Sequence, residues 1–93
     1  MSKLPPKPTA IDGCNLRLYR MFVLASWLKE IQGASIEKLQ AFMTLKFGMR
    51  RRTAKELAAD MENARILKTN SVKFVLTPDG EKWLKEIAKE GGF

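Results

Sequence analysis

Three consecutive arginines, Arg50, Arg51 and Arg52, followed by Lys55, are the side chains of this sequence best suited to binding chemistry. They stand at the start of a predicted helix over 51–64, where the helix dipole is positive and acidic residues are preferred. Guanidinium groups bind phosphate and guanine through paired hydrogen bonds. Because an external anion would offset both the mutual repulsion and the dipole, the cluster predicts a binding site for a polyanion.

The positive charge of the chain is concentrated in three segments without acids, 1–10, 44–55 and 65–75. They hold ten of the 17 Lys and Arg residues, and because the net charge is +7, the remaining sequence carries −3. Such a separation is typical of nucleic-acid-binding proteins, and a basic surface that only keeps the protein soluble is the alternative. Lys46 is expected to contact phosphate. Lys3 and Lys7 are expected to lie on DNA, or else to belong to a frayed terminus.

The predicted helix over 51–64 has two distinct faces. Its inner stripe, which should pack on the core, consists of Ala54, Leu57, Ala58 and Met61. The opposite face carries Arg52, Lys55, Ala59 and Asn63, flanked by Arg51 and Glu56. This face suits the major groove of DNA, where Arg binds guanine, Asn binds adenine and a small residue permits close approach. The same geometry turns Arg50 toward the protein, so Arg50 should contact phosphate or structure rather than bases. A solvated surface helix is the alternative.

Two further helices are expected before this one. The first runs from about Asn15 to Ile31, with Asp12 or Asn15 as its cap and Gly33 at its end. The second runs from Ile36 to about Lys46, with Ser35 as its cap and Gly48 at its end.

After residue 65 the spacing of apolar residues changes from a helical to a strand pattern. Strands are predicted over 66–69 and 72–76, with Asn70 and Ser71 as a tight turn. A last helix is expected from Pro78 to the glycines at 91–92, with Thr77 as its cap. The predicted fold class is mainly α with a small β-hairpin, in a single domain over 12–93. A flexible, basic, proline-rich arm over 1–11 precedes it.

The first helix is apolar around nearly its whole circumference, which is typical of a helix covered on more than one side. One side can face the core, and in so short a chain a second subunit is the expected cover of the other. The predicted dimer interface consists of Leu18, Phe22 and Trp27 on this helix and Trp83 on the last one.

Composition argues against several classes of function. With Cys14 as the only cysteine and no histidine, the chain has no Cys/His zinc ligands and cannot form an intrachain disulfide. Cys14 is expected to be an inert small hydrophobe. No combination of residues suited to general acid–base catalysis is found in the sequence. We therefore expect neither an enzyme nor a bound metal or other cofactor. The longest apolar run, 21–28, is too short to cross a bilayer, and the N-terminus lacks the core of a signal peptide. These features predict a cytoplasmic protein; its association with nucleoid or plasmid DNA is what the resemblance described below implies.

Two motifs resemble the PadR- and MarR-like groups of winged helix-turn-helix DNA-binding proteins. "MENARIL" (61–67) resembles the segment that ends their recognition helix, and "VLTPDGEKWL" (75–84) resembles the passage from the second wing strand into the last helix. The predicted order of three helices, two strands and a helix is that of a winged helix. Arg65 stands where those groups usually carry glycine. Because a left-handed arginine costs about 1 kcal/mol or more, the helix over 51–64 is expected to end differently from theirs.

The resemblance also implies which residues contact DNA. The major-groove helix would present Arg51, Arg52, Thr53, Lys55, Glu56 and Ala59. The wing would present Lys68, Asn70, Ser71 and Lys73 to phosphates or the minor groove. The start of the second helix, around Ser35, would donate a backbone N–H to phosphate.

In size and layout the chain resembles the small site-binding proteins of archaeal plasmid partition, the AspA type. That resemblance implies a homodimer that binds a palindromic duplex, spreads along DNA as a higher-order array and recruits a ParB-like adaptor and a ParA-type ATPase. A small transcriptional repressor is one alternative, and a winged helix used as a protein-docking scaffold is another. A single-stranded or RNA binder would need aromatic side chains on the basic face, which carries none.

Overall fold

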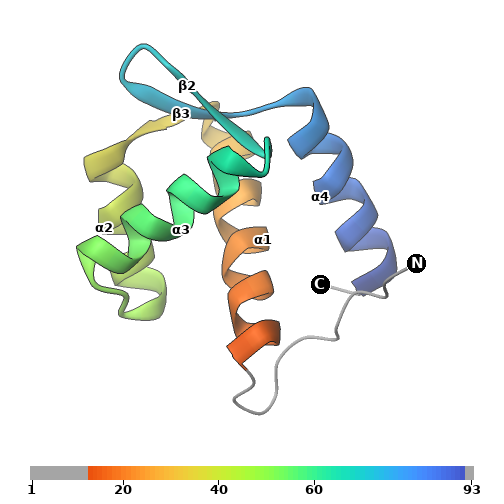
Figure 1. Cartoon of the computed structure of the whole chain (residues 1–93), viewed down its shortest axis with the longest axis horizontal. Helices are drawn as coiled ribbons and strands as arrows, with labels where there is room; N and C mark the ends of the chain where they lie inside the picture. Colours follow the sequence, from red (N-terminus) through yellow and green to blue (C-terminus); the bar gives the residue numbers. More distant parts are fainter. Residues whose placement is uncertain (1–12, 92–93) are drawn as a thin grey trace.

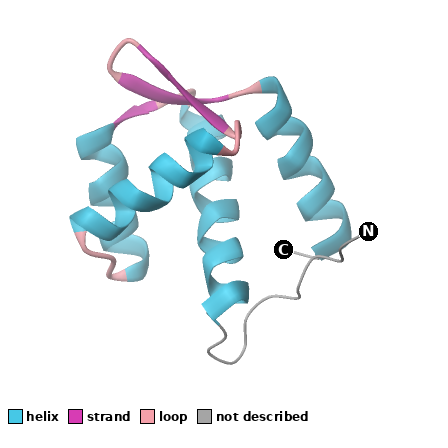
Figure 2. Cartoon of the chain, viewed as in Figure 1, coloured by secondary structure: helices cyan, strands magenta, loops and turns pink. Residues whose placement is uncertain are grey.

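The computed structural model describes residues 13–91, and the side chains of 16–89, as a mostly helical fold with a small antiparallel sheet (Figures 1 and 2). In chain order the elements are α1 (Gly13–Ile31), β1 (Ala34–Ser35), α2 (Ile36–Phe47), α3 (Arg51–Asn63), β2 (Leu67–Asn70), β3 (Lys73–Leu76) and α4 (Pro78–Gly91). The prediction of a mainly α fold with a hairpin is confirmed. The predicted arm with Lys3 and Lys7, the predicted cap Asp12 and the side chain of Cys14 lie outside the described parts.

Most helix ends follow the predicted signals. Ser35 caps α2, and its hydroxyl accepts a hydrogen bond from the backbone N–H of Lys38 (3.3 Å). Gly48 ends α2 in the left-handed conformation, with a φ of 68°. Asn15 lies inside α1, which already begins at Gly13, so the prediction of Asn15 as a cap is wrong.

The sheet contains a strand that the sequence pattern did not indicate. β1 is two residues long and pairs antiparallel with β3, which gives the strand order β1-β3-β2. A strand of two residues is too short to show an alternating pattern of apolar residues. Its pairing partner also lies about 40 residues away in the sequence.

The hairpin turn lies one residue later than predicted. Leu67 pairs with Leu76, and counting from this apolar pair places Asn70 opposite Lys73. Ser71, with a φ of 59°, and Val72 therefore form the turn. The predicted turn at Asn70 and Ser71 is wrong, because the pairing of the apolar residues, not the turn propensity of Asn70, sets the register.

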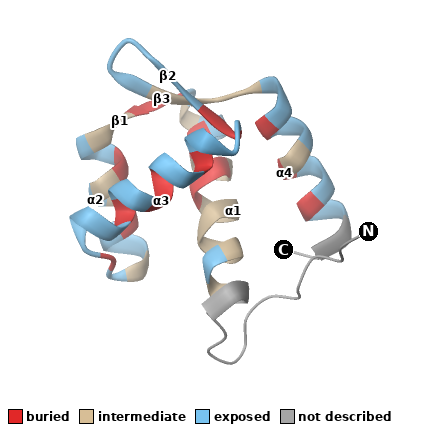
Figure 3. Cartoon of the chain, in the orientation of Figure 1, coloured by how far each residue is buried: buried red, intermediate tan, exposed pale blue. Residues whose placement is uncertain are grey.

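The core lies where the helices and the sheet meet (Figure 3). The largest fully buried side chains come from five different elements and are Leu24, Leu28, Leu39, Met43, Met61, Leu67 and Ile87. α2 packs on α3, and α4 packs on α1, which runs through the centre of the molecule in Figure 1. α1 thus has cover on more than one side within its own chain, although most of its described apolar side chains are only half-buried.

The end of α3 differs from what the sequence predicted. Arg65 adopts the left-handed conformation (φ 65°), as glycine would. Its N–H donates to the carbonyl of Glu62 (3.0 Å), and the N–H of Ile66 donates to the carbonyl of Met61 (2.9 Å). These two bonds form a Schellman motif, and the buried side chains of Ile66 and Met61 provide its apolar contact. The expectation that Arg65 would change the helix end is wrong, because the hydrogen bonds and this burial outweigh the backbone strain.

Replacing Arg65 by glycine should therefore stabilise the protein by up to about 1 kcal/mol, because glycine adopts a positive φ without strain. Urea denaturation of the full chain measures the change. Arg65→Ala is the matched control, since it removes the same charge but keeps the strain. Equal stability of the glycine and alanine variants would show that backbone strain at this position is negligible.

Thr77 joins the end of α3 to the start of α4. Its hydroxyl lies within hydrogen-bonding distance of the carbonyls of Arg65 and Ile66, the latter at 3.1 Å. The same oxygen accepts a hydrogen bond from the N–H of Gly80 (2.8 Å), which confirms Thr77 as the cap of α4. The Thr-Pro-Asp-Gly motif thus fixes the exit of the hairpin against the end of α3.

Candidate nucleic-acid interface

α3 is held by one buried face, as predicted. Ala54, Leu57, Ala58 and Met61 are all at most 3% exposed. This stripe fixes the rotation of α3 about its own axis, because turning the helix would expose apolar area worth about 25 cal/mol per Å². The orientation of the opposite face is therefore set by the core.

Most of the predicted outward residues of α3 lie on or beside that opposite face, whereas Thr53 lies on the side toward α1, where it lines a hollow with Arg17 and Arg20. Arg51, Arg52, Thr53, Lys55, Glu56 and Ala59 are exposed. In Figure 3 the ribbon of α3 alternates between exposed and buried residues. Arg52 and Glu56 form an i,i+4 ion pair of 3.8 Å between side chains that are 91% and 68% exposed. An exposed pair of this kind contributes little, so Arg52 can exchange Glu56 for another anion at small cost.

The structure corrects the predicted orientation of Arg50. Arg50 is the N-cap of α3, with extended backbone (φ −69°, ψ 152°), and it is exposed. The predicted orientation assumed helical geometry at Arg50, which does not apply because the residue precedes the helix. All three arginines therefore lie at the surface around the first turn of α3.

The turn between α2 and α3 positions this arginine cluster. Gly48 donates its N–H to the carbonyl of Thr44 (2.8 Å), and the Thr44 hydroxyl donates to the carbonyl of Met49 (2.6 Å). Met49 is 5% exposed and anchors the turn in the core. The side-chain amide of Gln40 donates to the carbonyl of Arg51 (3.0 Å). The roles of Thr44 and Gln40 were not predicted; Gln40 acts through a contact between two helices, and Thr44 acts through the conformation of the turn.

The hairpin carries the predicted polar residues at its surface. Lys68, Asn70, Ser71 and Lys73 are exposed. Because paired residues share a face of the sheet, the register places Lys68, Asn70 and Lys73 on one face and Thr69 and Phe74 on the other. The face of Thr69 points to α3, where the Thr69 hydroxyl donates to the carboxylate of Glu62 (2.9 Å). The two hairpin lysines therefore lie on the side that faces away from α3.

Ser35 and Lys46 lie at opposite ends of α2. Ser35 is half-buried and pairs with Lys73 in the sheet, so the start of α2 adjoins the hairpin. Lys46 is exposed in the last turn, close in sequence to the arginine cluster. In Figure 1 the hairpin and the turn between α2 and α3 lie at opposite ends of these two helices. The predicted cations of the described residues thus form two groups. Lys46 and the arginine cluster lie at the start of α3, Lys68 and Lys73 lie beyond its end, and Lys55 lies between the two groups.

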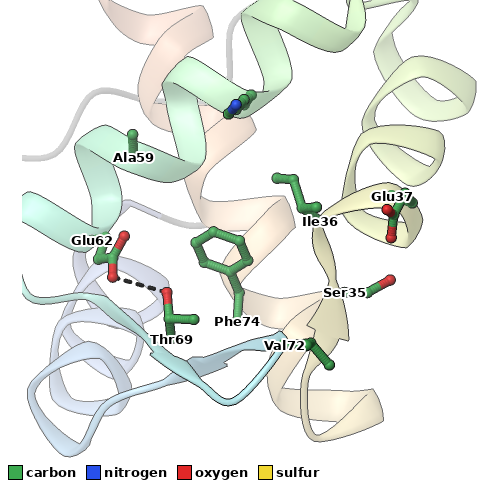
Figure 4. Close-up of a pocket in the computed structure, with 9 residues that line it drawn as sticks. Ser35, Ile36, Glu37, Ala59, Glu62, Thr69, Val72 and Phe74 are labelled. Atoms are coloured by element: carbon green, nitrogen blue, oxygen red, sulfur yellow. Dashed lines mark hydrogen bonds between the residues drawn. The ribbon is translucent and has the colours of Figure 1, made fainter.

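A groove that the sequence did not reveal lies between α3, the hairpin and the start of α2 (Figure 4). Its volume is about 680 Å³, and its lining residues are Ser35, Ile36, Glu37, Lys55, Ala59, Glu62, Thr69, Val72 and Phe74. Val72, at the turn, is 76% exposed. The apolar side chains come from three elements, so only the tertiary structure brings them together.

Two arginines of α1 lie on the other side of α3. Arg17 forms an ion pair with Asp60, which ties α1 to α3. The Arg20 guanidinium lies over the ring of Phe47, 5.5 Å from its centroid. These contacts use both arginines within the fold, since Arg17 ties α1 to α3 and Arg20 ties α1 to α2.

The predicted dimer residues are all half-buried within one chain. Leu18, Phe22, Trp27 and Trp83 retain part of their surface. Trp27 stacks on Phe42 of α2 with ring centroids 4.1 Å apart and planes at 3°. Trp27 therefore has a packing role inside the chain, and its predicted place in a dimer interface stays a prediction.

Within the described side chains, no group of three or more His, Cys, Asp and Glu residues is placed to hold a metal ion. In the same part of the chain, no helix has the length and apolar character needed to cross a membrane. Comparison with protein-family models, with curated proteins and with solved structures finds no match.

Proposed function

We propose that this protein binds double-stranded DNA as a winged helix-turn-helix protein. In this proposal α3 enters the major groove, and the β2–β3 hairpin is the wing. The supporting observation is the combination of a basic first turn of α3 with a buried inner stripe that fixes its outward direction. An exposed helix start that carries arginines, and whose orientation is fixed by the core, suits both phosphate binding and contacts to guanine.

The roles within the interface follow from position. Arg52 and Lys55 point outward from α3 and would reach base edges, and Ala59 leaves room for a close approach. Arg50 and Lys46, at the turn before α3, would bind phosphates on one side. Lys68 and Lys73 would bind phosphates on the other side, beyond the hairpin.

The proposed biological unit is a homodimer on a palindromic site, because two-fold proteins read sites with the same symmetry. By resemblance we propose a role in plasmid partition, with a ParB-like adaptor as partner; a transcriptional repressor is the alternative. Footprinting on a long DNA fragment separates them. Protection that grows beyond one palindrome as protein is added supports partition, and a footprint of fixed length supports repression.

A protein-docking scaffold is the second candidate class, and the apolar groove beside α3 favours it. The two classes differ in what they bind. Selection of bound duplexes from a random library, followed by titration at about 50 mM salt, tests the main proposal. We expect an enriched palindromic duplex that is preferred over its separated strands. If no duplex is enriched and none binds at this salt concentration, the DNA-binding proposal is wrong.

Lys73→Ala is expected to weaken binding to all duplexes to a similar extent, because a phosphate contact carries no sequence information. The slope of log K against log salt should become shallower by about one. Titrations of the full chain at several salt concentrations measure it, with Lys85→Ala on α4 as the control for net charge. An unchanged slope would exclude Lys73 from the interface.

A further inference from the structure

The groove between α3, the hairpin and the start of α2 has the properties of a docking site for an extended peptide. Phe74, Ile36, Val72 and Ala59 contribute its apolar surface, and Figure 4 shows the Phe74 ring in its centre. Val72 is 76% exposed although it is apolar. A concave, preformed, aromatic-containing groove is the kind of surface on which proline-rich segments bind at low entropic cost.

The charges around the groove select for a cationic segment. Glu37, in the first turn of α2, and Glu62, in the last turn of α3, both line it, whereas Lys55 is its single cationic lining residue among those described. A chain with a net charge of +7 thus presents more acidic than basic side chains at this place. Phosphates would be repelled by these carboxylates, so the part of the groove beside Glu37 and Glu62 is poorly suited to nucleic acid, whereas Lys55 and Ala59 also belong to the proposed DNA-binding face of α3.

The sequence contains one segment with the matching chemistry. Lys3-Leu4-Pro5-Pro6-Lys7-Pro8 combines three prolines and a leucine with two lysines and has no acid. In a polyproline conformation the two lysines would lie about 12 Å apart, so one segment can place apolar residues in the groove and a lysine near each side of it. We propose that this segment of one copy of the chain docks in the groove of a second copy.

Chain length favours a second copy over the same chain. α1 has 19 residues and is therefore roughly 28 Å long. Phe74 pairs with Ala34, which follows the C-terminal end of α1, so the centre of the groove is about one length of α1 away from Gly13. Pro8 precedes Gly13 by five residues and reaches only about 16 Å from it. The whole segment therefore cannot lie along the groove of its own chain.

Disulfide crosslinking of full-length chains tests this inference in the absence of DNA, so that its outcome does not depend on the proposed function. Both partners carry Cys14→Ser, which removes the only native cysteine. One partner carries Leu4→Cys, the other carries Ala59→Cys with a size tag, and added oxidised glutathione accepts the two electrons released when the two thiols join. Ala88→Cys on α4 is the matched acceptor control, since it is also an exposed alanine on a helix. Figure 1 shows α4 on the other side of α1 from α2.

We expect the mixed disulfide to form at least about tenfold faster with the cysteine at 59 than with the one at 88, because docking raises the local thiol concentration. Equal rates would overturn the proposal. A chain carrying both Leu4→Cys and Ala59→Cys that closes its own disulfide at a rate unaffected by dilution would also overturn it, since the segment would then dock within its own chain.

The contribution of the charged side chains to docking is measured separately, by the crosslinking rate of variants that lack them. Lys3→Gln with Lys7→Gln in the donor, or Glu37→Gln in the acceptor, should slow crosslinking at position 59 roughly two- to fivefold, as expected for exposed ion pairs. The lysine changes lie outside the described residues, and every described side chain is kept. Rates unchanged in both variants would overturn the choice of this basic segment as the occupant.

Discussion

Replacing Arg52 and Lys55 together by alanine is expected to weaken binding to the selected duplex by about 100-fold. Each side chain points outward from α3 and is exposed, so its loss would remove a base or phosphate contact of the proposed complex without disturbing the core. A good contact of an arginine with guanine contributes about 1–3 kcal/mol to discrimination between bases. Fluorescence anisotropy with the selected duplex and with a scrambled one measures both affinity and specificity.

A charge-matched control variant on α4 makes this test specific to α3. The variant Lys82→Ala with Lys85→Ala changes the net charge by the same amount, and both of these lysines are exposed on α4. We expect that variant to lose only the small, nonspecific part of the affinity. If the two double variants lose affinity equally, net charge alone accounts for binding, and the placement of α3 in the major groove is wrong.

The second large effect concerns stability. Replacing Gly80 by alanine is expected to lower the free energy of unfolding by about 3 kcal/mol, the upper part of the range for overpacking. A Cβ atom at this position would lie 2.1 Å from the carbonyl oxygen of Ile66 and 3.0 Å from Cδ1 of Leu76. That oxygen is the acceptor for the N–H of Thr77 (3.0 Å), so it cannot move away without breaking the junction between α3 and α4.

Thermal denaturation checks this expectation, and a loss of 3 kcal/mol should lower Tm by more than about 10 °C in a domain of this size. Gly48→Ala is the matched control, because a Cβ there has no atom within 4 Å and only the φ of 68° is unfavourable. We expect that control to cost about 1 kcal/mol. Equal losses for the two variants would mean that the contact with Ile66 relaxes freely.

Local signals predicted much of this fold because they depend on few neighbouring residues. The caps at Ser35 and Thr77, the left-handed Gly48 and the buried stripe of α3 each follow from residue type and helical spacing. The exposure of Arg52 and Lys55 follows in turn from that stripe, because the side opposite a buried face of a helix is exposed. The charged face of the candidate site was therefore predictable before any tertiary contact was known.

Features that depend on contacts between distant segments were not predictable in the same way. β1 is a strand only because Ala34 and Ser35 meet β3, and the turn lies at Ser71 and Val72 because Leu67 pairs with Leu76. Trp27 was expected at a subunit interface, but its stacking on Phe42 requires α2 to lie against α1. For β1 and Trp27 the partner is too far away in the sequence for spacing to indicate it, and in the hairpin the pairing of apolar residues outweighs the local turn signal.

The helices, the caps of α2 and α4 and the basic outward face of α3 follow from the sequence alone, because these are set by residues within a few turns of one another. The tertiary structure was needed to show that the cations of the described residues form two groups at the ends of α3, and that an apolar groove lined by Ile36, Val72 and Phe74 lies between α3, the hairpin and the start of α2. It also decided that Arg65 takes a conformation suited to glycine. The physical reason is that hydrogen bonds and burial between distant segments can outweigh a local preference of about 1 kcal/mol.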